Sequence, residues 1–499
     1  MAGRVTTLGS GRAGWWPLAG VLVIAGLVRV PFAAAKDVWF DEAFTWRLVS
    51  LPCGEIVART AGDVHPPGYY LLMKGWVSLA GDSIAGMRGV SVVLSLVTIA
   101  GVYAVATTLH DSCLAATGRG DVPPGRVGAV TAAAAAVSPY AIQTDTDARM
   151  YPLYTALLAF ATWFFLRTLT APTRPAPWAG FVACLTAALY THNYALFFAA
   201  SFAAAHGLVI CLGGKVPARR AAAAYLVVGL AYLPWLAVLA AQVERVREDY
   251  WLPVLRVAMI GQTISAFAYH PDVAVTGFWP TVAGVGVGVG VVLTAGVRRG
   301  PAAAGVAVLT ALPFALAAAA AAVVPLWADR YFRFSHLLLL VTLFSAIARV
   351  PWEGVRVGLV VGFFAFTALA LADLAGRLPA ADDQGIRAAC LEVVRQAEPG
   401  DTALVDQPYL YLPCAYFLSE HLPTYLSKSA APRHYSGAQI LSPSDVPPDG
   451  VPRGRVWYIA STPYTYPDEL HGATLVHVKN YYPVISGKTI YSVQLYRIR

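Results

Sequence analysis

The sequence predicts a polytopic, all-α membrane protein that carries a small α/β domain at its C-terminus. Of the 499 residues, 57% are hydrophobic and only 13% are charged, whereas a soluble globular protein carries about 25% charged residues. Apolar stretches of spanning length recur up to residue 376, and a more polar pattern with short β-rich runs follows. We therefore predict a transmembrane domain at 1–377 and a separate α/β domain at 378–499.

About eleven stretches approach the length of about 20 apolar residues that is needed to cross a bilayer. They cover 15–35, 88–110, 127–141, 151–169, 178–191, 194–213, 221–241, 276–296, 302–324, 334–349 and 357–376. The first stretch superficially resembles a cleaved secretory signal. We interpret it as a retained helix, because cleavage after its small residues would detach the loop that follows.

The basic residues indicate the orientation in the membrane, because cytoplasmic loops are enriched in Lys and Arg. With the N-terminus inside, the basic residues of the cytoplasmic connections are Arg119, Arg126, Arg167, Arg174, Lys215, Arg219, Arg220, Arg298, Arg299, Arg349 and Arg356. The net charge of +8 is therefore a topology signal, and no nucleic-acid partner is expected. We expect a multi-pass plasma (inner) membrane protein with a cytoplasmic N-terminus and an extracytoplasmic C-terminal domain.

The first extracytoplasmic loop, residues 36–87, is long and contains amphipathic segments. Residues 41–50 and 69–80 alternate aromatic or apolar residues with polar ones at roughly helical spacing. We predict helices that lie in the membrane interface at both places. The segment 254–267 is a further candidate for such a helix.

An adjacent carboxylate pair, Asp41 and Glu42, follows the first apolar stretch and is flanked by aromatic residues. A general base must lie within hydrogen-bond reach of the acceptor hydroxyl. Asp41 fits this catalytic role, and Glu42 would position the acceptor or raise the basicity of its neighbour. The alternative is that the pair is a solvated part of the loop.

A second polar cluster, DVHPPGYY, contains Asp63 and His65. Its two prolines restrict the backbone and leave Gly68 to begin the interfacial helix. The alternatives for His65 are a structural hydrogen-bond donor, a phosphate contact, and a metal ligand together with Glu42 or Asp63.

Arginines beside aromatic residues form a third group on the same side of the membrane. Arg149 lies in the turn DTDARMYP, and Arg330 and Arg333 lie in PLWADRYFR. A planar guanidinium is suited to bind a lipid-linked phosphate, whereas snorkelling to lipid headgroups is the alternative. Further candidate substrate-binding residues on this side are Asp147, Tyr151, His192, Tyr194 and Tyr331.

The order of these motifs resembles that of the GT-C glycosyltransferases. Asp-Glu after the first span, HPPGYY, ARMYPL, THNYALFF and DRYF before a late span are most similar to the family-39-like branch. That branch contains protein O-mannosyltransferases and the lipid A aminoarabinose transferase. The resemblance covers roughly residues 15–376, and the tail resembles the extracytoplasmic α/β domains that many of these enzymes carry.

The resemblance implies an inverting hexosyl- or pentosyltransferase that moves mannose, arabinose or a similar sugar. The donor would be a polyprenyl-phosphate sugar, and the acceptor a glycolipid, polysaccharide or protein of the cell envelope. Asp41 matches the family's catalytic carboxylate, and Arg149 and Arg330 fall where donor-phosphate contacts are expected. The form DTDARMY departs from the more usual EARMY-like motif, which puts an acidic role of Asp147 in doubt.

Metal dependence stays open, because some relatives use a divalent cation near these carboxylates and others do not. Mg²⁺, Mn²⁺ and Ca²⁺ are the candidates, with Glu42 and His65 as candidate ligands. A bridge between Cys390 and Cys414 in the tail is also open, because spacing alone does not establish a pairing.

A transporter or flippase of a lipid-linked sugar is the alternative function. Transporters place ionisable residues near the bilayer midplane and often contain internal repeats, whereas here the ionisable clusters fall in loops on one side. A scaffold that uses the tail as an adhesive module is a third hypothesis, and it would not need the Asp-Glu pair.

Overall fold

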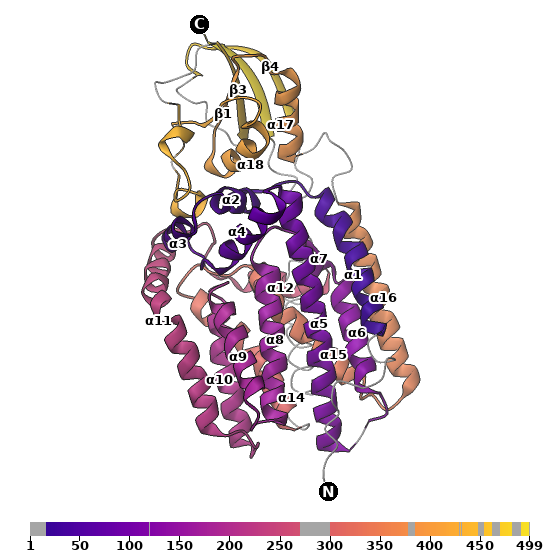
Figure 1. Cartoon of the computed structure of the whole chain (residues 1–499). Coiled ribbons are helices and arrows are strands. Elements are labelled where there is room, and N and C mark those ends of the chain that lie inside the picture. The colour runs from indigo at the N-terminus through magenta and orange to yellow at the C-terminus, as the bar shows by residue number, and fades with distance from the viewer. Residues whose placement is uncertain are drawn as a thin grey trace.

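The computed structural model describes residues 16–118, 120–269, 300–377, 385–428, 430, 432–447, 454–461, 470–481 and 491–498. A bundle of long helices makes up most of the molecule, and a small sheet domain sits above one end of it (Figure 1). Short helices of the first loop lie between the bundle and the sheet. The predicted fold class is thus a membrane helical bundle with a C-terminal α/β domain, and the structure confirms it.

Within the described ranges, seven helical segments are long and apolar enough to cross a membrane. They are α1 (Trp16–Ala35), α5 (Ile84–Thr117), α8 (Tyr151–Thr170), α11 (Ala218–Glu248), α14 (Pro301–Ala321), the segment formed by the 3-10 helix η1 (Asp329–Phe332) with α15 (Arg333–Ile347), and α16 (Glu353–Gly376). Shorter apolar helices are α6 (Pro124–Val137), α9 (Pro175–Leu189), α10 (Ala195–Cys211) and α12 (Val257–Ala268). The predicted span at 276–296 lies outside the described residues, so the count of about eleven is not confirmed.

The predicted span at 127–141 is interrupted rather than continuous. α6 ends at Val137, and α7 (Pro139–Asp145) begins after Ser138, whose side chain accepts a hydrogen bond from the Ala141 N–H at 3.3 Å. Pro139 lacks an N–H and restricts the residue before it, which ends α6. The break leaves helix carbonyls without an intrahelical partner, and the side chain of Arg29 satisfies those of Ala135 and Ala136 at 3.2 and 2.6 Å.

The first loop folds into three short helices on the sheet-domain side of the bundle, α2 (Phe40–Val49), α3 (Cys53–Gly62) and α4 (Gly68–Ala80) (Figure 1). The predictions for 41–50 and 69–80 are confirmed as helices, and α12 matches the third predicted segment. The sequence analysis missed α3. It begins after Pro52, and its buried face is narrow, with only Ile56 and Thr60 buried.

The C-terminal domain contains α17 (Gly385–Gln396), β1 (Thr402–Val405), α18 (Pro408–Leu418), β2 (Thr424–Leu426), β3 (Gly454–Ser461), β4 (Thr474–Tyr481) and β5 (Tyr491–Ile498). The sheet has five strands in the order β2-β1-β3-β5-β4, parallel at β2-β1-β3 and antiparallel at β3-β5-β4. Cys390 and Cys414 are free, buried thiols on α17 and α18.

The sheet domain is attached to the first loop by specific contacts. Tyr416 of α18 packs edge-on against Trp46 of α2 at a centroid distance of 5.3 Å. Its hydroxyl accepts a hydrogen bond from the backbone N–H of Ile84 at 3.2 Å. Asp37 accepts a hydrogen bond from the Ile386 N–H at 2.8 Å, close to the start of α17. The domain therefore lies directly over the loop that carries the Asp41–Glu42 pair.

Candidate active site

A small pocket lies where the first loop, the bundle and the C-terminal domain meet. Seven of the twelve predicted site residues line it, namely Asp41, Asp63, His65, Arg149, Tyr151, Arg330 and Tyr331. Phe40, Phe44, Val64, Tyr250, Trp251 and Tyr435 complete the lining. Residues from distant parts of the sequence thus converge on one polar site.

Arg149 is the central cation of this pocket and is 3% exposed. Its Nη1 donates hydrogen bonds to the backbone oxygen of Asp41 at 3.1 Å and to the hydroxyl of Tyr70 at 3.2 Å. Its Nε lies 3.7 Å from the Asp41 carboxylate and has no hydrogen-bond partner. The side chain of Asp41 keeps 18% of its surface exposed, so an acceptor molecule can reach it.

Arg330 lies beside the same pocket and is held by aromatic rings. Its guanidinium carbon lies 5.4 Å from the ring centroid of Trp39 and 5.3 Å from that of Trp251, within the range of cation–π attraction. Its Nε is buried without a hydrogen-bond partner. Arg149 and Arg330 therefore both bring unused donors to the pocket, as an anion-binding site requires.

Asp63 and His65 are buried in the loop between α3 and α4. Burial raises the pKa of the Asp63 carboxyl to about 7, although the positive charge of Arg149 opposes this shift. Burial is also the main cause that lowers the pKa of His65 well below its usual value. Asp63 can thus exchange a proton near neutral pH, and the His65 ring is neutral there.

The loop that carries these two residues is fixed from outside. Asn193 donates to the backbone oxygen of Val64 at 2.9 Å, and Arg245 of α11 donates to the backbone oxygens of Ala61 at 2.6 Å and Asp63 at 3.2 Å. Gly68 donates its N–H to the backbone oxygen of Tyr190 at 2.8 Å. A Cβ at Gly68 would lie 2.6 Å from that oxygen, so a glycine is needed for this approach.

Glu42 does not line the pocket. Its carboxylate is fully buried and forms a bidentate ion pair with Arg88, with distances of 2.8 and 2.6 Å. It also accepts a hydrogen bond from the Ala148 N–H at 2.8 Å. Its oxygens are thus occupied, and Glu42 does not fit the suggested role of a metal ligand with His65. Among the described residues, no group of three or more His, Cys, Asp or Glu side chains is arranged to hold a metal ion.

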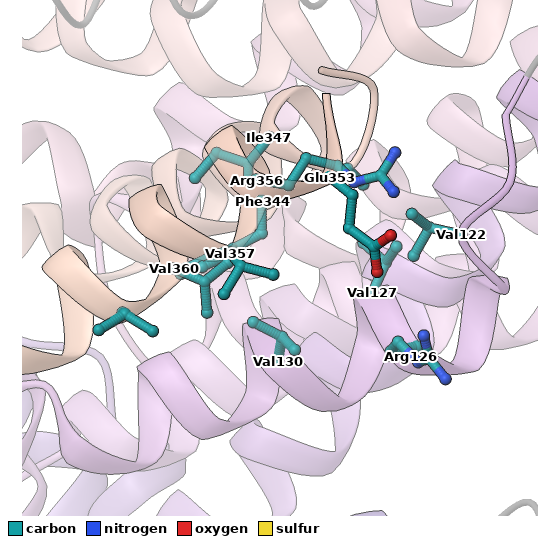
Figure 2. Close-up of a pocket in the computed structure, with 12 residues that line it drawn as sticks. Val122, Arg126, Val127, Val130, Phe344, Ile347, Glu353, Arg356, Val357 and Val360 are labelled. Carbon is teal, nitrogen blue, oxygen red and sulfur yellow. The ribbon is translucent and has the colours of Figure 1, made fainter. Parts of the chain in front are cut away.

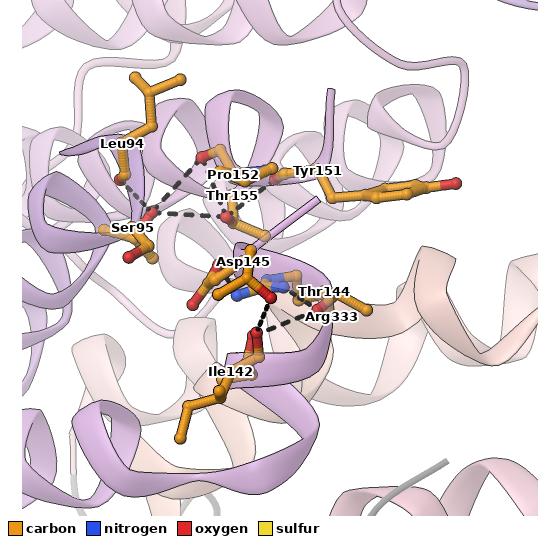
Figure 3. Close-up of polar contacts among 12 residues, drawn as sticks. Leu94, Ser95, Ile142, Thr144, Asp145, Tyr151, Pro152, Thr155 and Arg333 are labelled. Atoms are coloured by element: carbon orange, nitrogen blue, oxygen red, sulfur yellow. Dashed lines mark hydrogen bonds and ion pairs between the residues drawn. The ribbon is translucent and has the colours of Figure 1, made fainter. Parts of the chain in front are cut away.

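Arg333 and Asp147 do not line the pocket either. Arg333 is 1% exposed and pairs with Asp145 and Thr144 inside the bundle (Figure 3). Asp145 binds Arg29 of α1 at 2.9 Å as well. Asp147 pairs with Lys36. The contacts of Asp145 with Arg29 and Arg333 tie α1, α7 and α15 together. The placement of Arg333 disagrees with a donor-phosphate contact.

His192 and Tyr194 lie behind the pocket. The His192 ring is 5.6 Å from that of His65 and 5.1 Å from that of Tyr331, between centroids. Its Nδ1 accepts a hydrogen bond from the Tyr194 N–H at 3.1 Å, and burial lowers its pKa to about 3. The Tyr194 hydroxyl donates to the backbone oxygen of Leu326 at 2.6 Å. Both residues support the aromatic wall of the pocket.

Apolar depressions also lie outside this site. One adjoins the loop of Asp63 and is lined by Val57 and Ala61 of α3, by Leu71 of α4 and the preceding Pro67, and by Trp235 of α11. Another lies at the opposite end of the bundle, where valines of α6 and α16 face each other and the charged residues Arg126, Glu353 and Arg356 lie beside them (Figure 2).

Solved structures with a similar arrangement were found by comparison of the whole chain. ArnT from Cupriavidus metallidurans bound to undecaprenyl phosphate superposes with a TM-score of 0.57 at 12% sequence identity, covering 97% of this chain and 98% of that chain. Its apo state gives 0.56 at 11% identity, covering 96% and 97%. The chain has the fold of ArnT. The expected arrangement, a membrane helical bundle with a C-terminal α/β domain, is thereby confirmed.

A second similar structure is the archaeal oligosaccharyltransferase AglB from Archaeoglobus fulgidus, in complex with an inhibitory peptide and a dolichol-phosphate. It gives a TM-score of 0.53 at 11% identity, covering 90% of this chain and 70% of that chain. No protein-family model matches the sequence, and no curated protein sequence matches it. The similarity to ArnT was therefore found by comparing three-dimensional structures.

Several residues of the pocket and of the buried ion pairs around it were missed by the sequence analysis. Arg29 and Arg88 lie in or next to apolar spans, where an arginine is costly and therefore informative. Tyr250, Trp251 and Tyr435 carried no comparable signal, because aromatic residues are frequent throughout this sequence, at 12%.

Proposed function

We propose that the protein is an inverting glycosyltransferase that moves a sugar from a polyprenyl-phosphate donor to an acceptor of the cell envelope. The observation that carries the proposal is the pairing, in one pocket, of unpartnered donors on Arg149 and Arg330 with the carboxyl groups of Asp41 and Asp63. Such a set can bind a phosphate and accept a proton at neighbouring points, as sugar transfer from a phosphate requires.

In the proposed reaction, the acceptor hydroxyl attacks the anomeric carbon as the bond from that carbon to the phosphate oxygen breaks. Asp41 accepts the proton of the attacking hydroxyl. Arg149 and Arg330 stabilise the negative charge that develops on the departing polyprenyl phosphate. Asp63 faces the same pocket and is the rival candidate for the base, because its pKa of about 7 suits proton transfer at neutral pH.

The lipid part of the donor would lie in the apolar groove formed by α3, α4 and α11, since this groove adjoins the Asp63 loop. The pocket would then face the extracytoplasmic side of the plasma membrane, with the N-terminus in the cytoplasm. This orientation follows from the basic residues of the opposite loops. The candidate sugars are mannose, arabinose and similar hexoses or pentoses.

The test is glycosyl transfer by the purified protein in nanodiscs. A panel of polyprenyl-phosphate sugars would be offered with an envelope extract that supplies glycolipid, polysaccharide and protein acceptors. Wild type, Asp41→Asn and Asp63→Asn would be compared, each with and without a chelator. We expect transfer by the wild type and a loss of at least about 100-fold in Asp41→Asn, the size typical of general-base removal.

Other outcomes would change the proposal in defined ways. A loss confined to Asp63→Asn would move the base to Asp63. Binding of polyprenyl-phosphate sugars by folded protein, without product from any donor, would contradict transfer and favour a transporter or flippase. A loss of transfer in the chelator arm would show that a divalent cation is required.

A further inference from the structure

A segment of the C-terminal domain, residues 433–439, crosses the mouth of the pocket and is here called the clasp. On one side, Nη1 of Arg433 lies 3.0 Å from both carboxylate oxygens of Asp249, which directly precedes the pocket residue Tyr250. On the other side, the side-chain amide of Gln439 donates a hydrogen bond to the backbone oxygen of Gly62 at 2.8 Å. The backbone oxygen of Gln439 accepts a hydrogen bond from the Arg59 side chain at 2.6 Å. The clasp thus joins both rims of the site.

The middle of the clasp contributes aromatic surface. The ring of His434 stacks on Tyr250, at a centroid distance of 6.2 Å and an angle of 18°. Tyr435 meets Tyr250 edge-on at 5.7 Å and lines the pocket together with Asp41 and Arg149. The Tyr435 hydroxyl accepts a hydrogen bond from Arg433 at 2.9 Å. The hydrogen bond from Arg433 and the contact with Tyr250 therefore hold the Tyr435 side chain in the pocket.

The lining divides chemically into charged groups and aromatic rings. The carboxyl and guanidinium groups can hold phosphate and the attacking hydroxyl, whereas Tyr250, Trp251 and Tyr435 offer flat apolar faces with polar edges. A sugar ring has the complementary surface, because its C–H groups form apolar faces and its hydroxyls point outward. A bare phosphate lacks the apolar C–H faces, and a prenyl chain lacks the hydroxyls, so only the sugar matches both properties of this wall.

We propose that Tyr435 is a specificity-determining residue that packs against the transferred sugar ring, so that the C-terminal domain completes the substrate site. This inference rests on the proposed function. The Arg433–Asp249 pair is 58% and 48% exposed, and an ion pair so exposed is weak. The Arg433–Asp249 pair therefore adds little to the attachment of the clasp, and its main local role is to position Tyr435 through the hydrogen bond to its hydroxyl.

Binding measurements test the inference without requiring turnover. Affinities for polyprenyl phosphate and for the polyprenyl-phosphate sugar would be measured on folded protein in nanodiscs. We expect the wild type to prefer the sugar-bearing lipid by about tenfold, a difference of about 1.4 kcal/mol. Tyr435→Ala should bind both lipids alike, whereas Tyr435→Phe should keep the preference because it keeps the ring.

Matched controls separate a local role from a general disturbance of the domain. Tyr409→Ala changes a partly exposed tyrosine of the same domain that does not line the pocket, and it should keep the preference. Arg433→Asp should reduce the preference, and adding Asp249→Arg should restore it by reversing the ion pair. If Tyr435→Ala keeps the wild-type preference, or the wild type has none, the inference is wrong even where sugar transfer is observed. If the preference behaves as expected but no transfer occurs, the proposed function fails and the sugar contact stands.

Discussion

Arg88 of α5 holds Glu42 of α2 in a buried, bidentate ion pair with distances of 2.8 and 2.6 Å. Arg88 also donates to the backbone oxygens of Ala33, Lys36 and Asp37 at 2.8 to 2.9 Å. The adjacent carboxylates of the first loop therefore differ in environment. Asp41 faces the pocket, whereas Glu42 joins α2 to Arg88 of α5, and Arg88 in turn binds the end of α1.

We predict that Glu42→Gln destabilises the protein by about 3–5 kcal/mol, because it leaves the buried charge of Arg88 without a partner. Thermal unfolding in detergent would measure this loss. Glu55→Gln is the control, since Glu55 pairs with Arg59 at the surface and its loss should cost less than about 1 kcal/mol. An unchanged melting temperature for Glu42→Gln would show that the ion pair has no structural role.

The two arginines of the DRYFR segment should have different roles, with Arg330 needed for ligand binding and Arg333 for stability. Arg330→Lys keeps the charge but loses the planar group between Trp39 and Trp251, so we expect about tenfold weaker binding of polyprenyl phosphate. Arg333→Lys disturbs the pairing with Asp145 and should lower the melting temperature instead. Ligand titration and thermal unfolding of both variants would check this. The same loss of affinity in both would contradict the separation.

Gly68→Ala should displace the loop of Asp63 and His65. The added Cβ would lie 2.6 Å from the Tyr190 oxygen, and relief of such a clash typically costs about 1–3 kcal/mol. We expect lower stability and weaker donor binding. Gly75→Ala on the same helix is the control, because a Cβ there meets nothing within 4 Å. That change should be neutral or stabilising, by up to about 1 kcal/mol.

Asp63 should make stability depend on pH. Its pKa is raised from 3.8 to about 7 in the folded protein, so between these values the folded state keeps a proton that the unfolded state has lost. This contribution is complete below pH 3.8 and is lost as pH rises through about 7. The free energy of unfolding of Asp63→Asn, minus that of the wild type, should therefore be larger at pH 8 than at pH 4. At about 1.4 kcal/mol per pKa unit, this difference should increase by up to about 4 kcal/mol. Thermal unfolding at both pH values measures the difference, and a pH-independent difference would contradict the buried carboxyl.

Much of the fold could be predicted from the sequence because it depends on local patterns. Long apolar runs predict membrane helices, and the alternating segments of the first loop predicted α2 and α4. The β-rich runs of the tail likewise predicted β1, β3, β4 and β5. The break between α6 and α7 was missed, although Pro139 marks it, because the flanking residues remain apolar enough to resemble a continuous span.

The site was predictable to the extent that its residues stand in recognisable motifs. Asp41, Asp63, His65, Arg149 and Arg330 were found in this way, and they line one pocket. The same motifs also contained Glu42, Asp147 and Arg333, which form buried ion pairs instead. A motif identifies charged residues near a site, but it does not say which of them are neutralised by a partner from a distant helix.

The sequence by itself determined the membrane class, the segregation of polar clusters into loops and the chemical character of the site. These properties follow from hydropathy and from the cost of placing charge in a bilayer, which each segment carries alone. Only the tertiary structure decided that Arg88 neutralises Glu42 and that Asp145 lies between Arg29 and Arg333. It also decided that Tyr435 reaches the pocket from the C-terminal domain. These relationships join residues up to several hundred positions apart, and they form only when the packed helices bring their side chains together.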